Sequence, residues 1–259
     1  PLNFGLRNKI MEFGLKGKGV IITGGSRGIG FAIANAFAAE GANISICGRT
    51  ESSLNEAKEK LAAHNGIAHA AICDVADASS LEAYINTAEH ALGGLNVLVN
   101  NPSGFGRTDD EDGWQKSIDV DLMATLRGSW QAIPFLERSG GGAIIHISTI
   151  SALTESMRTP PYGAIKAAVN HYAVTQAKSL AKKGIRVNAI CPGSIYFEGG
   201  VWDDAKKNNR ALYDSIQTSI PSGRFGVPEE IATVAVFLGS EAGRWITGQA
   251  IAVDGGQSL

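Results

Sequence analysis

A short apolar run that leads straight into a glycine-rich turn constrains the fold of this chain more than any other feature. Residues 20–22 are apolar and strand-like, and Gly24, Gly28 and Gly30 follow at a spacing that lets the backbone leave a strand sharply and enter a helix. Residues 31–40 then repeat apolar side chains along one helical face. Because a helix N-terminus offers free N–H groups and the positive end of a dipole, this order of strand, turn and helix is typical of a dinucleotide site.

The same alternation of strand and helix continues to the end of the chain. Further strand-like runs are predicted at residues 43–47, 67–73, 95–99, 143–147, 185–190 and 250–253, and helices at 51–64, 79–92, 114–136, 160–182 and 228–238. Strands that are apolar almost throughout indicate a parallel sheet covered on both faces. We therefore predict an α/β protein with a single-domain, doubly wound Rossmann fold and a seven-stranded parallel sheet, formed by residues 18–259.

Three local features complete this outline. Residues 1–17 form an N-terminal extension that does not fit the pattern, and Met11 is a possible natural start. Ser79 or Ser80 is expected to cap the helix that follows. Residues 194–222 scatter aromatic side chains among glycines and charges, which predicts a lid over a substrate site.

Composition excludes several classes of protein. A net charge of -2 offers no basic field for nucleic acid, and no run of eighteen apolar residues indicates a membrane span. No secretory signal pattern opens the chain, so a cytoplasmic protein is expected. Cys47, Cys73 and Cys191 share neither disulfide nor metal-ligand spacing, so we expect them to be buried and reduced, and we predict no metal site.

Tyr162 and Lys166 lie four residues apart on a predicted helix, so their side chains share one face. An ammonium group beside a phenol favours the phenolate, and we expect it to lower the pKa of Tyr162 from its usual value of about 10. The pair is a candidate for acid–base chemistry. The alternative is an ordinary surface pair on an amphipathic helix.

Several motifs together resemble those of the short-chain dehydrogenase/reductase family, and most closely the branch of the 3-oxoacyl-[acyl-carrier-protein] reductases. The resemblance extends over residues 18–256. The motifs, in the family's order and spacing, are residues 23–30, Asn100-Asn101, residues 162–166, Pro192-Gly193, residues 224–228 and Asp254-Gly255-Gly256.

The resemblance implies a role for each matched residue. Tyr162 would be the general acid or base, and Lys166 would hold the nicotinamide ribose and depress the pKa of the tyrosine. Thr149 stands where the family has its catalytic serine and keeps a hydroxyl donor. Asp121 stands where the family has an asparagine whose backbone carbonyl holds a relay water, and its carboxylate would compete for the Lys166 ammonium. Residues implied to bind the cofactor are Gly24, Gly25, Ser26, Arg27, Gly28, Ile29 and Gly30 at the pyrophosphate, Asp74 and Val75 at the adenine, Asn100 with Tyr162 and Lys166 at the riboses, and Ile195 at the carboxamide.

The end of the second predicted strand bears on cofactor choice. Family members selective for NAD place an acidic residue there to bind the ribose 2′-hydroxyl. Here Gly48 and Arg49 follow the strand, and Arg27 lies in the glycine turn. Two guanidinium groups without a carboxylate favour a 2′-phosphate, so we predict NADP(H), with NAD(H) as the alternative if both arginines are merely solvated.

These interpretations predict an NADP(H)-dependent oxidoreductase that interconverts a carbonyl compound and an alcohol. The substrate would be a small molecule held by residues 102–107, residues 149–157 and the lid with Tyr196, Phe197 and Trp202. The alternatives are an NAD-dependent alcohol dehydrogenase and a dinucleotide-binding protein without turnover. The resemblance also implies a homotetramer built through the two long helices and the C-terminal segment.

Overall fold

The computed structural model describes residues 13–259. Residues 1–12, which hold most of the expected N-terminal extension and Met11, lie outside the described residues. The remainder forms seven strands that build one parallel sheet in the order β3-β2-β1-β4-β5-β6-β7. The strands are β1 (Gly19–Ile22), β2 (Asn43–Gly48), β3 (Ala68–Ile72), β4 (Val97–Asn100), β5 (Gly142–Ile147), β6 (Ile185–Pro192) and β7 (Ala250–Val253).

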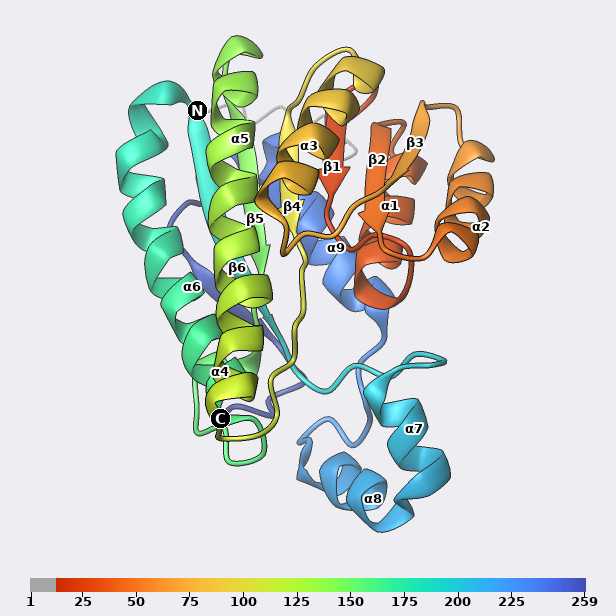
Figure 1. Cartoon of the computed structure of the whole chain (residues 1–259), viewed down its shortest axis with the longest axis vertical. Helices are drawn as coiled ribbons and strands as arrows, with labels where there is room; N and C mark the ends of the chain where they lie inside the picture. The colour runs from red at the N-terminus through yellow and green to blue at the C-terminus, as the bar shows by residue number, and fades with distance from the viewer. Residues whose placement is uncertain (1–12) are drawn as a thin grey trace, which may run out of the picture.

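Two layers of helices cover the sheet, because its strands are apolar on both faces. One core joins β1, β2 and β5 to α1 (Gly28–Ala39), α2 (Glu51–Ala62) and α9 (Pro228–Gly239). The opposite core joins the sheet to α3 (Ala78–Leu92), α5 (Ala124–Arg138) and α6 (Pro160–Leu180). Figure 1 shows α3, α5 and α6 on the near face and α9 behind the strands. The predicted doubly wound α/β fold is confirmed.

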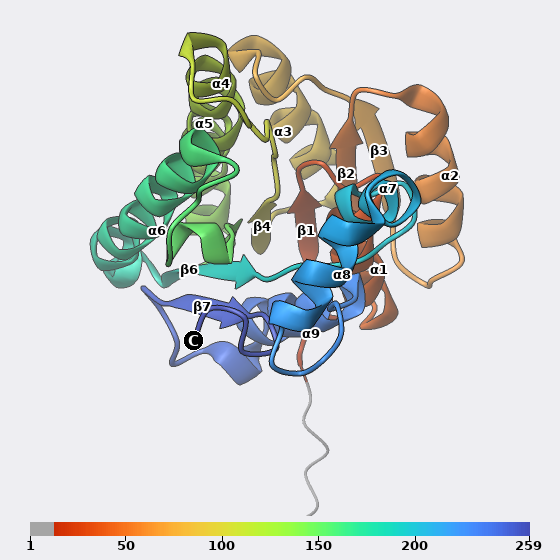
Figure 2. The same ribbon diagram turned by 90° about the horizontal axis from the view of Figure 1, so that it is seen from below.

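Strand order reverses at β1, which pairs with β2 on one side and with β4 on the other. The connections that leave the carboxyl ends of β1 and β4 therefore run to opposite faces and leave a crevice between them, the usual ligand site of such sheets. Beyond this edge lie α7 (Val201–Asn208) and α8 (Arg210–Ser219), which Figures 1 and 2 show apart from the two covering layers.

Some local predictions were wrong. The helix predicted at 114–136 starts earlier, as α4 (Glu111–Lys116), because the Asp110 carboxylate accepts from the Gly113 amide 2.8 Å away. It then passes through a π-helical turn, η1 (Ser117–Met123), before α5. The cap of α3 is Asp77, whose carboxylate is 2.9 Å from the Ser80 amide nitrogen, and not Ser79 or Ser80. No helix was predicted in the proposed lid, residues 194–222, but this segment contains the two helices α7 and α8.

Cys47, Cys73 and Cys191 are all buried and unpaired, as predicted. Across residues 13–259 no helix is long and apolar enough to cross a membrane. In the same residues, no group of three or more His, Cys, Asp or Glu side chains is placed to hold a metal ion.

Candidate active site

The glycine turn after β1 has the geometry that its sequence predicts. Gly24 and Gly28 have φ angles of 65° and 54°, in the left-handed region that favours glycine. A Cβ atom on Gly24 would lie 2.9 Å from the Asn101 carbonyl oxygen, and one on Gly30 would lie 2.2 Å from the Gly24 carbonyl oxygen. Side chains at these positions would clash with backbone, so the close packing of this turn requires glycine at both.

The start of α1 fits the phosphates of a dinucleotide. The first-turn N–H groups of any helix lack an intrahelical partner. The residue before α1, Arg27, makes no side-chain capping bond to them, so these groups can donate to an anion. The Arg27 guanidinium instead donates to the Gly199 carbonyl, 3.4 Å away. Phe197 lies close to the turn, because a Cβ on Gly28 would be 2.7 Å from its ring. The segment before α7 therefore contacts the phosphate turn directly.

The end of β2 lies next to this turn. A Cβ on Gly48 would be 3.2 Å from the Ser26 hydroxyl, which places Gly48 beside the predicted pyrophosphate site. Arg49 follows Gly48 and is exposed. Asp74 and Val75 follow β3 at the same edge of the sheet, with Asp74 exposed and Val75 partly buried. These predicted cofactor residues therefore gather at one edge.

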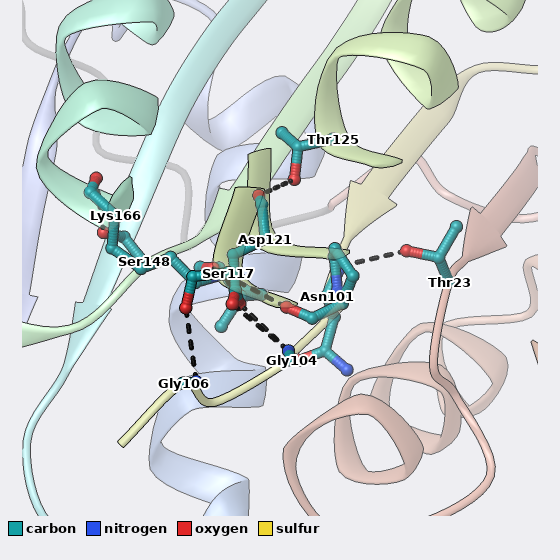
Figure 3. A network of polar contacts seen from close by, with 11 residues as sticks. Thr23, Asn101, Gly104, Gly106, Ser117, Asp121, Thr125, Ser148 and Lys166 are labelled. Carbon is teal, nitrogen blue, oxygen red and sulfur yellow. Dashed lines mark hydrogen bonds and ion pairs between the residues drawn. The ribbon is translucent and has the colours of Figure 1, made fainter. Parts of the chain in front are cut away.

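The side chain of Asn100 lies below the edge of the sheet at which a ribose was predicted. Its side chain is 1% exposed and is directed at the Ser129 hydroxyl, 3.1 Å away, and at the ring of the buried His146. The neighbouring Asn101 makes the contact with the turn, since its amide group donates to the Gly24 carbonyl over 3.0 Å. The Asn101 backbone N–H also donates to the Thr23 hydroxyl (Figure 3). The Asn100 side chain thus shapes the packing below the site, and Asn101 ties β4 to the turn.

Tyr162 and Lys166 lie on one face of α6, as the spacing predicts, with the Lys166 Nζ 5.7 Å from the centre of the Tyr162 ring. Lys166 is 1% exposed, whereas Tyr162 is partly buried. Thr149 follows β5 and is also partly buried. Its hydroxyl acts to lower the pKa of the Tyr162 phenol, against the larger effects of burial and Asp121. The structure therefore places Tyr162 beside Lys166, as the spacing predicts.

Three protein oxygens surround the Lys166 ammonium. It donates to the carbonyls of Pro102 and Ile147, over 3.0 Å and 2.9 Å, and forms an ion pair with Asp121 at 3.3 Å. Asp121 is fully buried and also accepts from the Gly104 amide, as Figure 3 shows. Three acceptors match the three N–H donors of an ammonium group. The sequence pointed to Asp121, but backbone carbonyls leave no sequence signal.

The predicted lowering of the Tyr162 pKa is wrong. Burial raises the pKa of Tyr162, and the negative charge of Asp121 raises it further. Lys166 does not offset this effect because its charge is already balanced by the Asp121 carboxylate. Hydrogen bonds from Ser103 and Thr149 act in the opposite direction. Ser103 lies in the segment 102–107 that was predicted to hold the substrate, but no effect on Tyr162 was predicted for it.

Aromatic side chains of α7, α8 and the residues before α9 pack on one another. Tyr213 stacks on Phe225 with ring centres 4.6 Å apart, and Trp202 lies 5.3 Å from the same phenylalanine. Ile195 is buried and pairs with Gly226 through a single β-bridge. The bridge joins the start of residues 194–222 to the residues just before α9. The Tyr196 hydroxyl donates to Asp203 in α7.

Known proteins resemble this chain over nearly its whole length. Residues 24–258 match the family model described as enoyl-(acyl carrier protein) reductase. An isoepoxydon dehydrogenase from Penicillium expansum is 36% identical over 252 residues, which cover 95% of this chain and 97% of that protein.

Solved structures agree with the sequence match. The crystal structure of L-sorbose reductase from Gluconobacter frateurii, complexed with NADPH and L-sorbose, aligns with a TM-score of 0.88 at 34% identity and covers 95% of this chain and 98% of that one. A 7α-hydroxysteroid dehydrogenase complexed with NADH and 7-oxo glycochenodeoxycholic acid aligns with a TM-score of 0.88 at 31% identity, over 95% of this chain and 96% of that one.

The fold, the glycine turn and these relatives define an oxidoreductase that uses a nicotinamide dinucleotide. The chain belongs to the short-chain dehydrogenase/reductase family. Its named relatives act on small molecules as dehydrogenases or reductases.

Proposed function

We propose that this protein reduces a ketone or aldehyde to an alcohol with NADPH, and that Tyr162 is the general acid. The observation that carries the proposal is the placement of Tyr162 beside Lys166 on α6, at the sheet edge that also holds the glycine turn. A phenol, a second hydroxyl on Thr149 and a fixed positive charge are the groups that polarise and protonate a carbonyl.

The roles of the side chains follow from their positions. The nicotinamide, when bound, supplies the hydride that reaches the carbonyl carbon. Tyr162 gives its phenolic proton to the carbonyl oxygen, and the Thr149 hydroxyl donates a hydrogen bond to the same oxygen. Lys166 keeps a positive charge beside the phenol, and its contacts with Asp121 and two carbonyls fix its orientation.

The raised pKa of Tyr162 is compatible with a role as general acid. Because burial and Asp121 raise this pKa, the phenol stays protonated at neutral pH. A protonated phenol is ready to act as an acid toward a carbonyl, whereas alcohol oxidation requires the phenolate as a base.

The surroundings of Gly48 support NADPH over NADH. No carboxylate occupies the end of β2, where it would bind a ribose 2′-hydroxyl, and the exposed Arg49 follows directly. A guanidinium group pairs well with a 2′-phosphate. The relative that is complexed with NADH makes an NAD-dependent dehydrogenase the second candidate.

Further expectations belong to the same proposal. The substrate is a small carbonyl compound held near residues 102–107 and 149–157, with the segment 194–222 as a lid. The active form is a homotetramer, and the protein resides in the cytoplasm.

The first experiment follows the absorbance of NADPH with a panel of ketones, aldehydes and 3-oxoacyl thioesters. We expect turnover by the native protein and a loss of about a hundredfold or more in Tyr162→Phe, because the proton donor is removed. NADPH affinity of both proteins is measured as the control and should be similar. Tight NADPH binding without turnover in either direction would favour a non-catalytic binding protein.

A further inference from the structure

The turn that leaves β4 is held in place at two points and carries Arg107 at its end. The Pro102 carbonyl accepts from the Lys166 ammonium over 3.0 Å, and the Gly104 amide donates to the Asp121 carboxylate over 3.2 Å. Lys166 and Asp121 form a buried ion pair, so the turn rests on two charges that balance each other (Figure 3). The start of this turn is therefore fixed.

Phe105, in the middle of the turn, connects Arg107 to the proposed general acid. Its ring meets the Tyr162 ring edge-on, with centres 5.1 Å apart and planes at 79°. The guanidinium carbon of Arg107 lies over the Phe105 ring, 4.9 Å from its centre, an arrangement that attracts a cation. Phe105 has a φ of 51°, and strained backbone persists where surrounding contacts enforce it. One aromatic ring thus separates the guanidinium group from Tyr162.

No carboxylate balances the charge of Arg107 within the described part of the chain. Arg107 is exposed and takes part in none of the ion pairs formed by residues 13–259. The acidic side chains that follow it bond elsewhere, since Asp109 accepts from the Trp114 indole over 3.0 Å. Asp110 accepts from an amide at the start of α4. The N–H donors of Arg107 are therefore left to bind an anion from solution.

Arg158, just before α6, repeats this arrangement. Its guanidinium carbon lies over the Trp202 ring of α7, 5.8 Å from the centre, and the side chain is exposed. Apart from Arg49, Arg107 and Arg158, each arginine of residues 13–259 donates to a protein oxygen. The proposed function gives Arg49 to the 2′-phosphate of NADPH. The other two arginines point to a second anion, one that belongs to the substrate.

We propose that the carbonyl substrate carries an oxyanionic group, a carboxylate or a phosphate, and that Arg107 binds this group. The inference rests on the proposed function and names the substrate class of the same site. A guanidinium group that lies on a ring face keeps the donors at its edge available, and these fit a carboxylate or a phosphate in pairs. Arg158 is a second cation that favours the approach of an anion. Lys166 cannot take this role, because it is buried and its charge is balanced by Asp121.

The test measures kcat/KM with NADPH for pairs of substrates that differ in one charged group. The pairs are levulinate and 4-benzoylbutyrate, each against its methyl ester, and dihydroxyacetone phosphate against dihydroxyacetone. We expect the native protein to favour the anion by about tenfold or more, mainly through a lower KM, and to lose this preference as the salt concentration rises. Arg107→Gln should reduce the preference about tenfold, and Arg107→Lys, which keeps the charge, should reduce it less. The pair with the larger preference identifies the oxyanion.

Arg138→Gln is the matched control, because Arg138 also stacks on a phenylalanine, at 4.4 Å, but lies on α5 and pairs with Glu89. Its preference should equal that of the native protein. The affinities of the same compounds, measured by NADPH fluorescence in Tyr162→Phe with and without Arg107→Gln, give the comparison in the absence of turnover.

Equal kcat/KM and equal affinity for anion and neutral partner, or a preference that Arg107→Gln leaves intact, would overturn the assignment of Arg107. Turnover that survives in Tyr162→Phe would overturn the proposed function instead. Tighter binding of the anions that depends on Arg107, with no turnover by the native protein, would uphold the anion site while the reductase is rejected. The two failures are therefore distinguishable.

Discussion

Asp121 places a buried negative charge beside the proposed catalytic pair, at a position where the family has a neutral asparagine. Its carboxylate lies 3.3 Å from Lys166 Nζ and also accepts from the Gly104 amide. The charge balances Lys166 and raises the pKa of Tyr162. The Asp121 carboxylate therefore limits how far the Lys166 ammonium can lower the pKa of Tyr162.

Replacing Asp121 by Asn should lower the pKa of Tyr162. The amide can still accept from Gly104, but Lys166 would keep an unbalanced positive charge that favours the phenolate. Reduction needs the phenol and is lost as the pH rises through the pKa of Tyr162, so this loss should begin about one pH unit lower than in the native protein. Oxidation of the alcohol needs the phenolate and should begin to rise at correspondingly lower pH. The measurement is kcat/KM against pH in both directions.

Asp119→Asn is the control for the charge, because Asp119 also lies on η1 and accepts from Gln115. Its pH profile should match that of the native protein. Identical profiles for Asp121→Asn and the native protein would contradict the assigned effect of Asp121.

Gly48 offers a test of cofactor choice. A Cβ there meets only the Ser26 hydroxyl, at 3.2 Å, and the end of the Leu54 side chain, so an aspartate can be accommodated. In Gly48→Asp we expect the ratio of kcat/KM for NADPH to that for NADH to fall by about a hundredfold, because the carboxylate repels a 2′-phosphate. Gly48→Asn has nearly the same shape without the charge and should change the ratio much less. A ratio that is equal in the two variants would argue against a 2′-phosphate at this position.

Among the secondary-structure elements, α7 is bonded to the segment directly before it through one carboxylate. Asp203 is 4% exposed and accepts from the Tyr196 hydroxyl, the Gly199 amide and the Lys207 ammonium. The bond from Lys207, followed by that from Gly199, lowers the pKa of Asp203 to about 2. Because this folded value lies below the usual value of about 4, the stabilisation is complete above about pH 4 and is lost as the pH falls through about 2.

Asp203→Asn should therefore loosen the segment around α7 while the sheet stays intact. An amide cannot serve these three donors as a carboxylate does, so we expect faster hydrogen exchange in residues 196–209 at neutral pH and an unchanged rate in β1 and β4. The control is Asp214→Asn, which breaks the exposed ion pair between Arg210 and Asp214 in α8. Equal exchange in Asp203→Asn and the native protein would contradict an anchoring role for Asp203.

The sequence predicted the strands, the glycine turn and the spacing of Tyr162 and Lys166 correctly, because each produces a clear local sequence pattern. The glycine turn, the strand runs and the spacing of Tyr162 and Lys166 each depend on local pattern, and the structure has all three. The π-helical turn at η1 was missed because it lies directly between two α-helices and is too short to show an apolar period of its own. The direction of the Tyr162 pKa was missed because it depends on which oxygens surround Lys166, and two of these are backbone carbonyls from distant segments.

At the scale of the whole molecule, large apolar side chains remain exposed on the helices that the family resemblance assigns to subunit contacts. Trp130 on α5 is 51% exposed and Val174 on α6 is 50% exposed. Trp245 and Leu259, near the C-terminus, are almost fully exposed. Neighbouring exposed apolar residues of this kind often mark protein interfaces.

Size-exclusion chromatography with light scattering should give the mass of four chains for the native protein. The double variant Trp130→Glu and Val174→Glu should give a smaller assembly, because it would bury two unpaired charges at the contact. Ile67→Glu replaces a comparably exposed residue outside these helices and should leave the mass unchanged. A native mass of one chain would contradict the tetramer.

The strand order also bears on how the chain is made. β2 and β3 add in turn to one side of β1, and β4, β5, β6 and β7 then add in turn to the other. Every strand after the first thus pairs with one that left the ribosome earlier, and none has to be inserted between two others. Since distant parallel pairings are slow to form, growth at the free edges lets a nascent chain cover its apolar surface in the order of its own synthesis.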